Sequence, residues 1–398
     1  MNQCFNAIQW GLRLMLLLQP FASGAQTIFP STLIRPAETS TDDEAGMLFR
    51  AGLGTQSIDN VKGSSSEQVS DVVVNQMVGA SLRSSFGRQK LLLDGSVSDY
   101  RYQSQTDLNY VGTSLAGTWQ WASGSNFFGS LSGSRTVTQN AIGTAVNSNS
   151  RNLNTSQSSS ALMGYDFGGG WQVSTGALQA SSENEQLVSG QALVSKYSGG
   201  FAAATYVYKS GNSLSMRALS GSGTNSYDYY VRSIEVRVDS VTNLGTTLSA
   251  ELNHIQQTYP NQSQYDFSGN SGRMSAVWVP TEKISVQGAL QRQIYGVPMS
   301  NAIYTVTDSA LISPSWAMTN KMTLKGSYQR SVIRYEGDPG SGASGQVDKF
   351  QTLSLGLEWK PTDNSDLSLT YSQSRHRSGL TDADTNINIV SLMGRFAF

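Results

Sequence analysis

The chain has 398 residues, of which 38% are hydrophobic, 9% aromatic and 14% charged, with a formal net charge of -1. Its hydrophobic share is too low for a helical or doubly wound core, and it is too apolar and aromatic for a disordered protein, whereas a β-barrel needs apolar side chains on only one face of each strand. The sequence has no basic run that could neutralise a series of phosphates, so we expect no nucleic-acid partner.

Residues 1–25 are expected to be a secretory signal peptide. Arg13 is their only charge, an apolar run extends from Leu14 to Leu18, and Ser23 and Ala25 fit a cleavage site before Gln26. The alternative is a membrane anchor, but the run is far shorter than the ~20 residues that a spanning helix needs. The single cysteine, Cys4, lies in this segment, so the expected mature chain lacks thiol chemistry and cysteine-ligated metal.

Residues 26–44 are expected to form a periplasmic N-terminal segment, and residues 45–398 a barrel. From about residue 45 onward, apolar and small polar residues alternate with the period of two that is typical of a two-faced strand. In VGTSLAGTWQW, for example, Val111, Leu115 and Trp119 share one face and Gly112, Ser114 and Ala116 the other. No convincing helical period or stretch suited to a membrane helix follows residue 25, so a membrane location would require a closed barrel.

Short turns and long connections divide this part of the chain. The short turns are GRQ after Phe86, SGSN near Gly124, GGG at Gly168 to Gly170, SGN near Gly211, TNLG near Asn243, PTEK, MTNK and PTDN. The long connections are Ile58 to Ser70, Gln139 to Ser156, Ser182 to Gly190, Glu336 to Gln346 and Ser378 to Thr385. This asymmetry is typical of outer-membrane barrels, whose short turns are periplasmic, and it predicts an all-β, antiparallel, up-and-down transmembrane barrel of about 18 strands, with 16 as the alternative.

A periplasmic aromatic girdle is predicted from the tryptophans that follow residue 25. All of them lie within a few residues of a short turn, as expected for indole rings at a bilayer interface: Trp119, Trp121, Trp171, Trp278, Trp316 and Trp359. Many tyrosines lie toward the other strand ends and suggest a second girdle: Tyr100, Tyr102, Tyr110, Tyr227, Tyr229, Tyr230, Tyr259, Tyr265, Tyr295, Tyr304 and Tyr335. An ordinary soluble sheet with tryptophan near its turns is the alternative interpretation.

The last residues, VSLMGRFAF, predict a closing strand and an insertion signal. Val390, Leu392, Phe396 and Phe398 alternate outward, and the chain ends on the aromatic residue. This pattern resembles the terminal strand by which bacterial outer-membrane barrels are recognised for insertion. A β-propeller could also give a forty-residue period, but the sequence lacks blade motifs and the apolar residues that a propeller core requires.

The sequence predicts no enzyme, cofactor or metal site. The two histidines, His254 and His376, fall in different hairpins, which argues against a histidine metal site. A hydrolase at the barrel rim is the remaining catalytic hypothesis, with His376, Ser374 and either Asp382 or Asp384 as its residues. A solvated loop histidine is the simpler explanation, and no catalytic residue is assigned.

The alternation also predicts which charged side chains line the lumen. These are Arg217, Glu235, Arg237, Glu251, Lys325, Glu358 and Arg395, among many serine, threonine, glutamine and asparagine residues. Such a lining suits passage or binding of a neutral or weakly charged sugar polymer, a water-filled porin, or a purely structural network of ion pairs. The alternation alone does not separate these three.

The chain resembles the EpsL-like outer-membrane barrels of exopolysaccharide biosynthesis operons, which are associated with exosortase systems. The likeness rests on LLLDGSVSDYRYQSQTDLNYVGTSLAGTWQW, SLSGSRTVTQ, YDFGGGW and the terminal FAF. It implies a non-enzymatic barrel of the Gram-negative outer membrane that serves exopolysaccharide biosynthesis or export as conduit or accessory. Its expected partners are outer-membrane lipids, the barrel-assembly machinery, polysaccharide and export-system proteins. A general diffusion porin for small solutes is the alternative function.

Overall fold

The computed structural model describes residues 46–140, 151–188, 191–242, 246–299, 302–337, 345–379 and 384–398. The predicted signal peptide and the predicted periplasmic segment, residues 1–25 and 26–44, lie outside the described residues. Within the described chain, no helix is long and apolar enough to cross a membrane.

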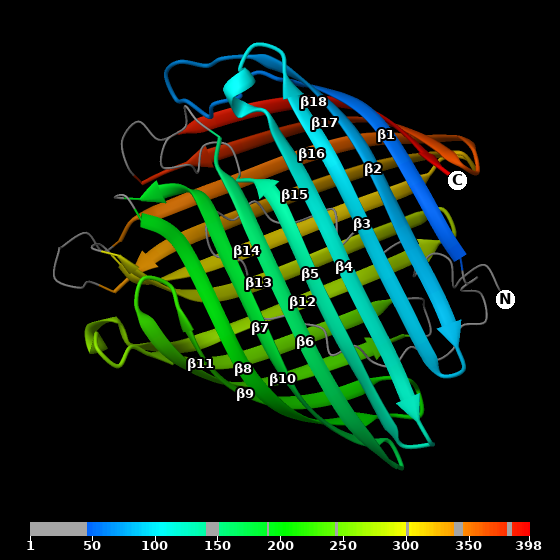
Figure 1. Ribbon diagram of the computed structural model, residues 1–398, viewed down its shortest axis with the longest axis vertical. Helices are drawn as coiled ribbons and strands as arrows, with labels where there is room; N and C mark the ends of the chain where they lie inside the picture. The colour runs from blue at the N-terminus through cyan, green and yellow to red at the C-terminus, as the bar shows by residue number, and fades with distance from the viewer. Residues whose placement is uncertain are drawn as a thin grey trace.

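The described residues form a closed antiparallel barrel of 18 strands (Figure 1). The strands are β1 (Gly46–Ile58), β2 (Asp71–Phe86), β3 (Gln89–Tyr102), β4 (Tyr110–Ser123), β5 (Phe127–Gln139), β6 (Leu153–Gly168), β7 (Trp171–Val188), β8 (Gln191–Val207), β9 (Ser213–Thr224), β10 (Asp228–Val241), β11 (Thr247–Thr258), β12 (Phe267–Thr281), β13 (Ile284–Met299), β14 (Ala302–Ala317), β15 (Met322–Glu336), β16 (Val347–Thr362), β17 (Ser365–Arg377) and β18 (Thr385–Ala397). Each strand pairs with its sequence neighbours, and β1 closes the sheet on β18. The predicted fold and strand number are confirmed.

The two ends of the barrel differ in their connections. The predicted short turns join β2 to β3, β4 to β5 and every later even-numbered strand to its successor, although the centre of the turn near Asn243 lies outside the described residues. The 3-10 helices η1 (Thr106–Leu108) and η2 (Ser263–Tyr265) lie in connections at the opposite end. In outer-membrane barrels the short turns are periplasmic, so this opposite end corresponds to their extracellular end, and the two ends are named accordingly below.

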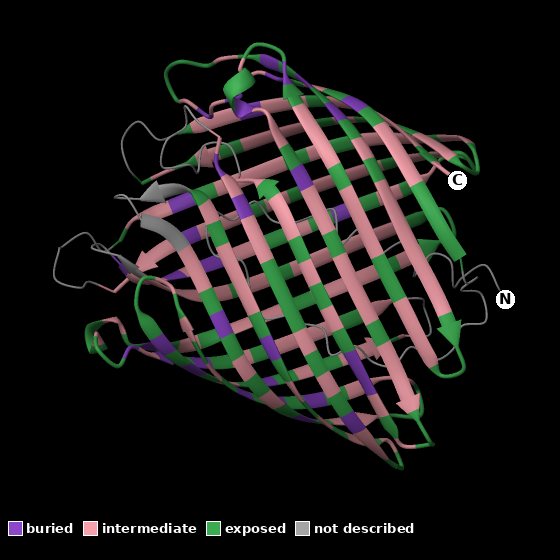
Figure 2. Cartoon of the chain, viewed as in Figure 1, coloured by how far each residue is buried: buried purple, intermediate pink, exposed green. Residues whose placement is uncertain are grey.

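The outer face carries an apolar band that begins at the periplasmic end. On β16 the outward positions Trp359, Leu357, Leu355 and Leu353 are all apolar, and Trp359 and Leu355 are about half exposed. On β17 the outward positions Leu367, Leu369 and Tyr371 repeat this pattern. Exposed and less exposed positions alternate along the strands (Figure 2), because successive side chains point to opposite faces of a sheet. Lipid can cover this band without leaving a backbone group unpaired.

One predicted connection is wrong. The residues from Ser182 to Gly190 were expected to form a long polar loop, but β7 continues to Val188 and β8 begins at Gln191. Pairing with β8 continues to Glu183 and resumes at Leu187 after a register shift. Polar residues are tolerated in the strand here because they lie beyond the apolar band, where outward positions do not face hydrocarbon. Polarity alone therefore does not end a strand of this barrel.

The C-terminal strand closes the barrel. Val390 and Phe396 point outward from β18 and are exposed, and β18 pairs with β1 from Ile58 to Arg50. Phe398 lies beyond β18, where its backbone exchanges two hydrogen bonds with Phe49 and the two rings stack with centroids 6.0 Å apart.

Candidate functional site

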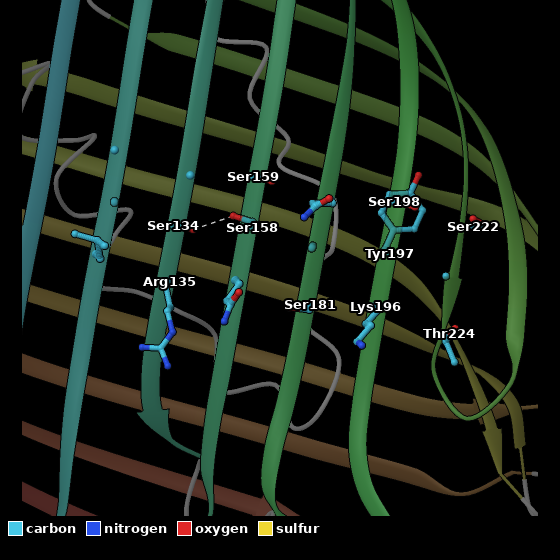
Figure 3. Close-up of a pocket in the computed structure, with 18 of the residues that line it drawn as sticks. Ser134, Arg135, Ser158, Ser159, Ser181, Lys196, Tyr197, Ser198, Ser222 and Thr224 are labelled. Atoms are coloured by element: carbon cyan, nitrogen blue, oxygen red, sulfur yellow. Dashed lines mark hydrogen bonds between the residues drawn. The ribbon is translucent and has the colours of Figure 1, made fainter.

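The lumen is the candidate site, and part of its wall is lined with hydroxyl groups. Ser132 and Ser134 on β5 face Ser160 and Ser158 on β6, with oxygen–oxygen distances of 2.7 and 2.8 Å. Figure 3 shows the bond between Ser134 and Ser158 on neighbouring strands. These hydroxyls bond to one another and can also exchange bonds with water or a polar solute, because each is both donor and acceptor.

A belt of alternating charge crosses β9 to β12 on the inner face. Arg217 lies directly opposite Glu235 and donates a hydrogen bond to it, and both side chains are buried. One step further along, Arg237 lies opposite Glu251, which in turn lies opposite Arg273.

The belt has no net charge. Arg237 also donates to Asp239 at 2.9 and 3.0 Å. Three arginines therefore accompany three carboxylates, namely Arg217, Arg237 and Arg273 with Glu235, Asp239 and Glu251. Such a belt presents both signs of charge to a solute without a net attraction for anions or cations.

Further ion pairs line other parts of the inner wall. Lys325 bonds Glu358 at 2.6 Å, and Arg395 bonds Asp366 at 2.8 Å. The register thus places all seven predicted lumen residues on the inner face: Arg217, Glu235, Arg237, Glu251, Lys325, Glu358 and Arg395. The Lys325 and Arg395 side chains remain 26% and 36% exposed, so water reaches them inside the barrel.

An aromatic cluster covers the inner wall of β8 to β12 near the extracellular end. Tyr197, Tyr229 and Tyr259 are buried in it together with Val231 and Phe267. The phenols of Tyr197 and Tyr229 lie over Gly221 and Gly223, where any Cβ would clash with them. Burial also raises the pKa of Tyr259, which lies in a connection, so its hydroxyl stays neutral.

The expectation of a second outer girdle is wrong for five of the tyrosines, whereas Tyr230 does point outward from β10 and is exposed. Tyr229 and Tyr259 belong to the inner cluster, Tyr102 is buried in a second inner cluster, and Tyr100 stacks on Tyr110 with centroids 4.5 Å apart. These side chains occupy inward positions because glycines and connecting segments leave room for rings there.

The six tryptophans predicted to form a periplasmic girdle lie on the outer face near the short turns. Trp171, Trp278, Trp316 and Trp359 are each about half exposed on the outer face, beside short turns. Trp119 is also exposed and donates its indole N–H to Gln89 at 3.1 Å, while Trp121 packs on the outer face against Gly129. Rings at the level of the short turns suit a bilayer interface.

The residues of the rim-hydrolase hypothesis do not form a triad in the described part of the chain. His376 stacks on Phe350 with centroids 4.2 Å apart, and both of its ring nitrogens are buried without a hydrogen-bond partner. Ser374 bonds Thr352 at 3.2 Å, Asp384 accepts the backbone N–H of Ser378, and Asp382 lies outside the described residues. A nucleophile that is not bonded to its base is not activated by it.

No other catalytic or metal centre stands out. The described residues contain no group of three or more histidine, cysteine or acidic side chains that could hold a metal ion. His254 bonds Asn270 at 2.8 Å on an outward, exposed position.

Sequence reasoning missed several lumen residues. Arg273 and Asp239 have the same parity as the belt, and Arg273 directly precedes the outward Met274 in a recognised strand. Extending each alternation by one or two residues would have found both. The inner tyrosines had a weaker signal, namely glycines that lie one or two strand positions away, as Gly199 does from Tyr197.

A closed wall with an apolar outer band and a charged, water-reached lumen is the architecture of a transmembrane β-barrel. No protein-family model matches the sequence, and no curated protein does. Solved structures match the fold at low identity. They include OpdK of Pseudomonas aeruginosa with vanillate, at 10% identity and a TM-score of 0.51 over 88% of this chain and 99% of that one.

Two further structures give the same result. OccK2 (OpdF) of Pseudomonas aeruginosa in complex with glucuronate has 10% identity and a TM-score of 0.51, covering 89% of this chain and 98% of its own. A BenF-like porin from Pseudomonas fluorescens Pf-5 has 10% identity and a TM-score of 0.50, covering 89% and 99%. The chain therefore has the fold of outer-membrane porins.

Proposed function

We propose that the protein is a diffusion porin of the Gram-negative outer membrane for small hydrophilic solutes. One observation carries this proposal: the charges on the inner wall are paired and balanced, yet side chains such as Lys325 and Arg395 remain in contact with water. Eighteen strands also make a barrel wide enough for an aqueous channel. On this proposal the protein reaches the membrane after residues 1–25 are removed, and it is not an enzyme.

The balance of charge on the wall favours neutral or weakly charged solutes. A channel that selects ions of one charge usually has a lining of the opposite charge, because the lining attracts those ions. Here each belt arginine instead has a carboxylate opposite or beside it. The porin fold of the similar structures also favours diffusion over polysaccharide export.

Reconstitution tests the proposal directly. The purified full-length protein should conduct small ions in a planar bilayer, and proteoliposomes should swell in neutral sugars at rates that fall with sugar size. A silent bilayer together with unswollen vesicles, from protein shown to be folded, would refute it.

Polysaccharide export is the second candidate function. The paired serines of β5 and β6 present hydroxyl groups that can form hydrogen bonds with a sugar chain. The resemblance to EpsL-like proteins agrees with this. If this candidate is right, deleting the gene should reduce surface polysaccharide, and proteins of the export system should be partners. Unchanged secretion would exclude it.

The hydrolase hypothesis has its own test. Full activity on lipid or glycan after His376→Ala would remove it, and so would the absence of any such activity in the unmodified protein.

A further inference from the structure

The barrel is taller than its apolar band. On β16 the band runs from Trp359 to Leu353, six steps of ~3.4 Å or about 20 Å along the strand, which a tilt of roughly 40° reduces to about 16 Å in height. The whole strand has 16 residues, so it is about 54 Å long, and a tilt of roughly 40° gives a wall about 40 Å tall. On β17 the apolar outward positions likewise end at Tyr371, and Gln373, Arg375 and Arg377 follow on the same face. The outer face beyond Leu353 and Tyr371 therefore no longer faces hydrocarbon and lies at the level of lipid headgroups.

Cations gather on this part of the outer face over β15 to β17. Arg330 on β15, Gln351 on β16 and Arg375 on β17 form one cross-strand row, and Val332, Lys349 and Arg377 form the next. The four cations Arg330, Lys349, Arg375 and Arg377 are all exposed. With strands about 4.8 Å apart and rows about 7 Å apart, they lie within roughly 10 by 7 Å. We call these four residues the outer cation patch.

The patch is not neutralised by the described part of the chain. Nearby, Asp308 bonds Arg292 at 2.6 Å and Arg334 at 2.5 Å, and Glu336 lies 3.7 Å from Arg334. Asp308 and Glu336 are therefore paired with Arg292 and Arg334 and not with the patch cations. Asp384 at the start of the β18 segment accepts the Ser378 N–H, and among the described residues no carboxylate lies within ion-pair distance of the four patch cations.

The register makes this arrangement unfavourable without a bound anion. Lys349 and Arg377 lie directly opposite each other, and like charges at directly opposite positions destabilise a sheet. The outward cations Arg292 and Arg334 lie next to the patch but share Asp308, whereas Arg135, Lys196 and Arg232 lie on the separate strands β5, β8 and β10. A ligand of opposite charge would relieve this concentration of like charge on one side of the wall.

We propose that the outer cation patch binds phosphate groups of a phosphorylated glycolipid in the outer leaflet. Guanidinium groups form charge-assisted, often bidentate hydrogen bonds with phosphate oxygens, and clustered basic residues at a membrane surface bind anionic headgroups. The leaflet surrounds the barrel at this height, whereas an acidic protein partner would need a second contact surface. The patch points away from the lumen, so its occupancy does not depend on what the channel conducts.

Glycolipid binding to the folded full-length barrel in detergent tests this inference. The probes are lipopolysaccharide, the same glycolipid with its phosphates removed, inorganic phosphate alone, and polyglutamate as a model acidic partner. Native mass spectrometry counts bound glycolipids, and a fluorescence titration gives the affinity. The variant carries Arg330→Gln, Lys349→Gln, Arg375→Gln and Arg377→Gln. The control carries three substitutions, Arg135→Gln, Lys196→Gln and Arg232→Gln, at positions that share the outward parity of exposed residues on β5, β8 and β10; Figure 3 labels Arg135 and Lys196.

The patch variant should bind lipopolysaccharide on the order of a hundredfold more weakly, since each basic residue near an anionic lipid surface contributes roughly a fivefold factor and salt screens part of it. The control variant should change binding only a few-fold. Equal losses in the two variants would overturn the proposal, and so would tighter binding of polyglutamate than of lipopolysaccharide.

The phosphate-free probe needs only the unmodified protein, so the test holds even if the patch variant does not fold. Undiminished binding of the phosphate-free glycolipid would overturn the proposal. Binding of inorganic phosphate as tightly as of lipopolysaccharide would overturn its lipid part.

Discussion

Substitution of Glu251 by glutamine should make the channel anion-selective. Glu251 lies between Arg237 and Arg273 on the inner wall, with one arginine directly opposite on each side. The substitution keeps the size and hydrogen-bonding capacity of the side chain but removes the central negative charge. The belt then carries one uncompensated positive charge in a part of the lumen that water reaches.

The size of the effect follows from Coulomb's law. At about 5 Å in a water-like dielectric, one charge changes the free energy of a passing monovalent ion by about 0.8 kcal/mol. In 0.1 M salt a Debye length of about 10 Å reduces this to about 0.5 kcal/mol, which enriches anions and depletes cations by roughly twofold each. The anion-to-cation permeability ratio should therefore rise about fivefold at 0.1 M and less than about twofold at 1 M, where the Debye length is about 3 Å.

Reversal potentials in planar bilayers under a salt gradient measure this ratio. The control is the double variant Glu251→Gln with Arg273→Gln, which restores the balance of charge and should have the selectivity of the unmodified protein. An unchanged ratio in the single variant, with conductance preserved, would show that the belt does not line the conducting path. An equal shift in single and double variants would refute the electrostatic reasoning.

Three other predictions concern the barrel itself. Glu235→Gln should lower the free energy of unfolding by about 3 kcal/mol because it leaves the buried Arg217 uncompensated. The double variant Arg217→Met with Glu235→Leu should lower the free energy of unfolding by less. Urea titration of the protein in vesicles measures both values. Leu355→Arg on the lipid face should cost about 2 to 4 kcal/mol, and Ser354→Arg on the lumen face far less, by the same titration; equal costs would contradict the assigned faces. Phe398→Ala should reduce the membrane-inserted fraction, measured by heat-modifiable gel mobility, and unchanged insertion would remove its predicted role as a signal.

The strand number and the two faces could be predicted because both depend on local pattern. A turn sequence such as GRQ or PTDN can be identified from its own residues alone. An alternation such as Leu353, Leu355 and Leu357 likewise identifies the lipid face without knowledge of the neighbouring strands. In a barrel the pairing of consecutive strands then follows from chain order, so the lumen positions of Lys325 and Glu358 follow too.

The remaining features depend on contacts between strands. Parity alone does not show that Lys349 and Arg377 share one cross-strand position, since that requires the register of β16 against β17. The inward position of Tyr229 likewise depends on space over Gly223 of the neighbouring strand. The individual residues of the belt could be predicted from their parity, but their pairing could not, because it also depends on the register between strands.

The height of the wall connects the mistaken loop with the outer cation patch. Beyond the apolar band an outward side chain meets headgroups and water, so selection for apolar residues ends there while the backbone ladder can continue. The segment from Ser182 to Val188 looks like a loop for this reason and is nevertheless strand. The same freedom permits Arg330, Lys349, Arg375 and Arg377 on outward positions of β15 to β17. Because those positions need only be polar, and serine or asparagine would satisfy that need without repulsion, four clustered cations there indicate selection for an anionic ligand.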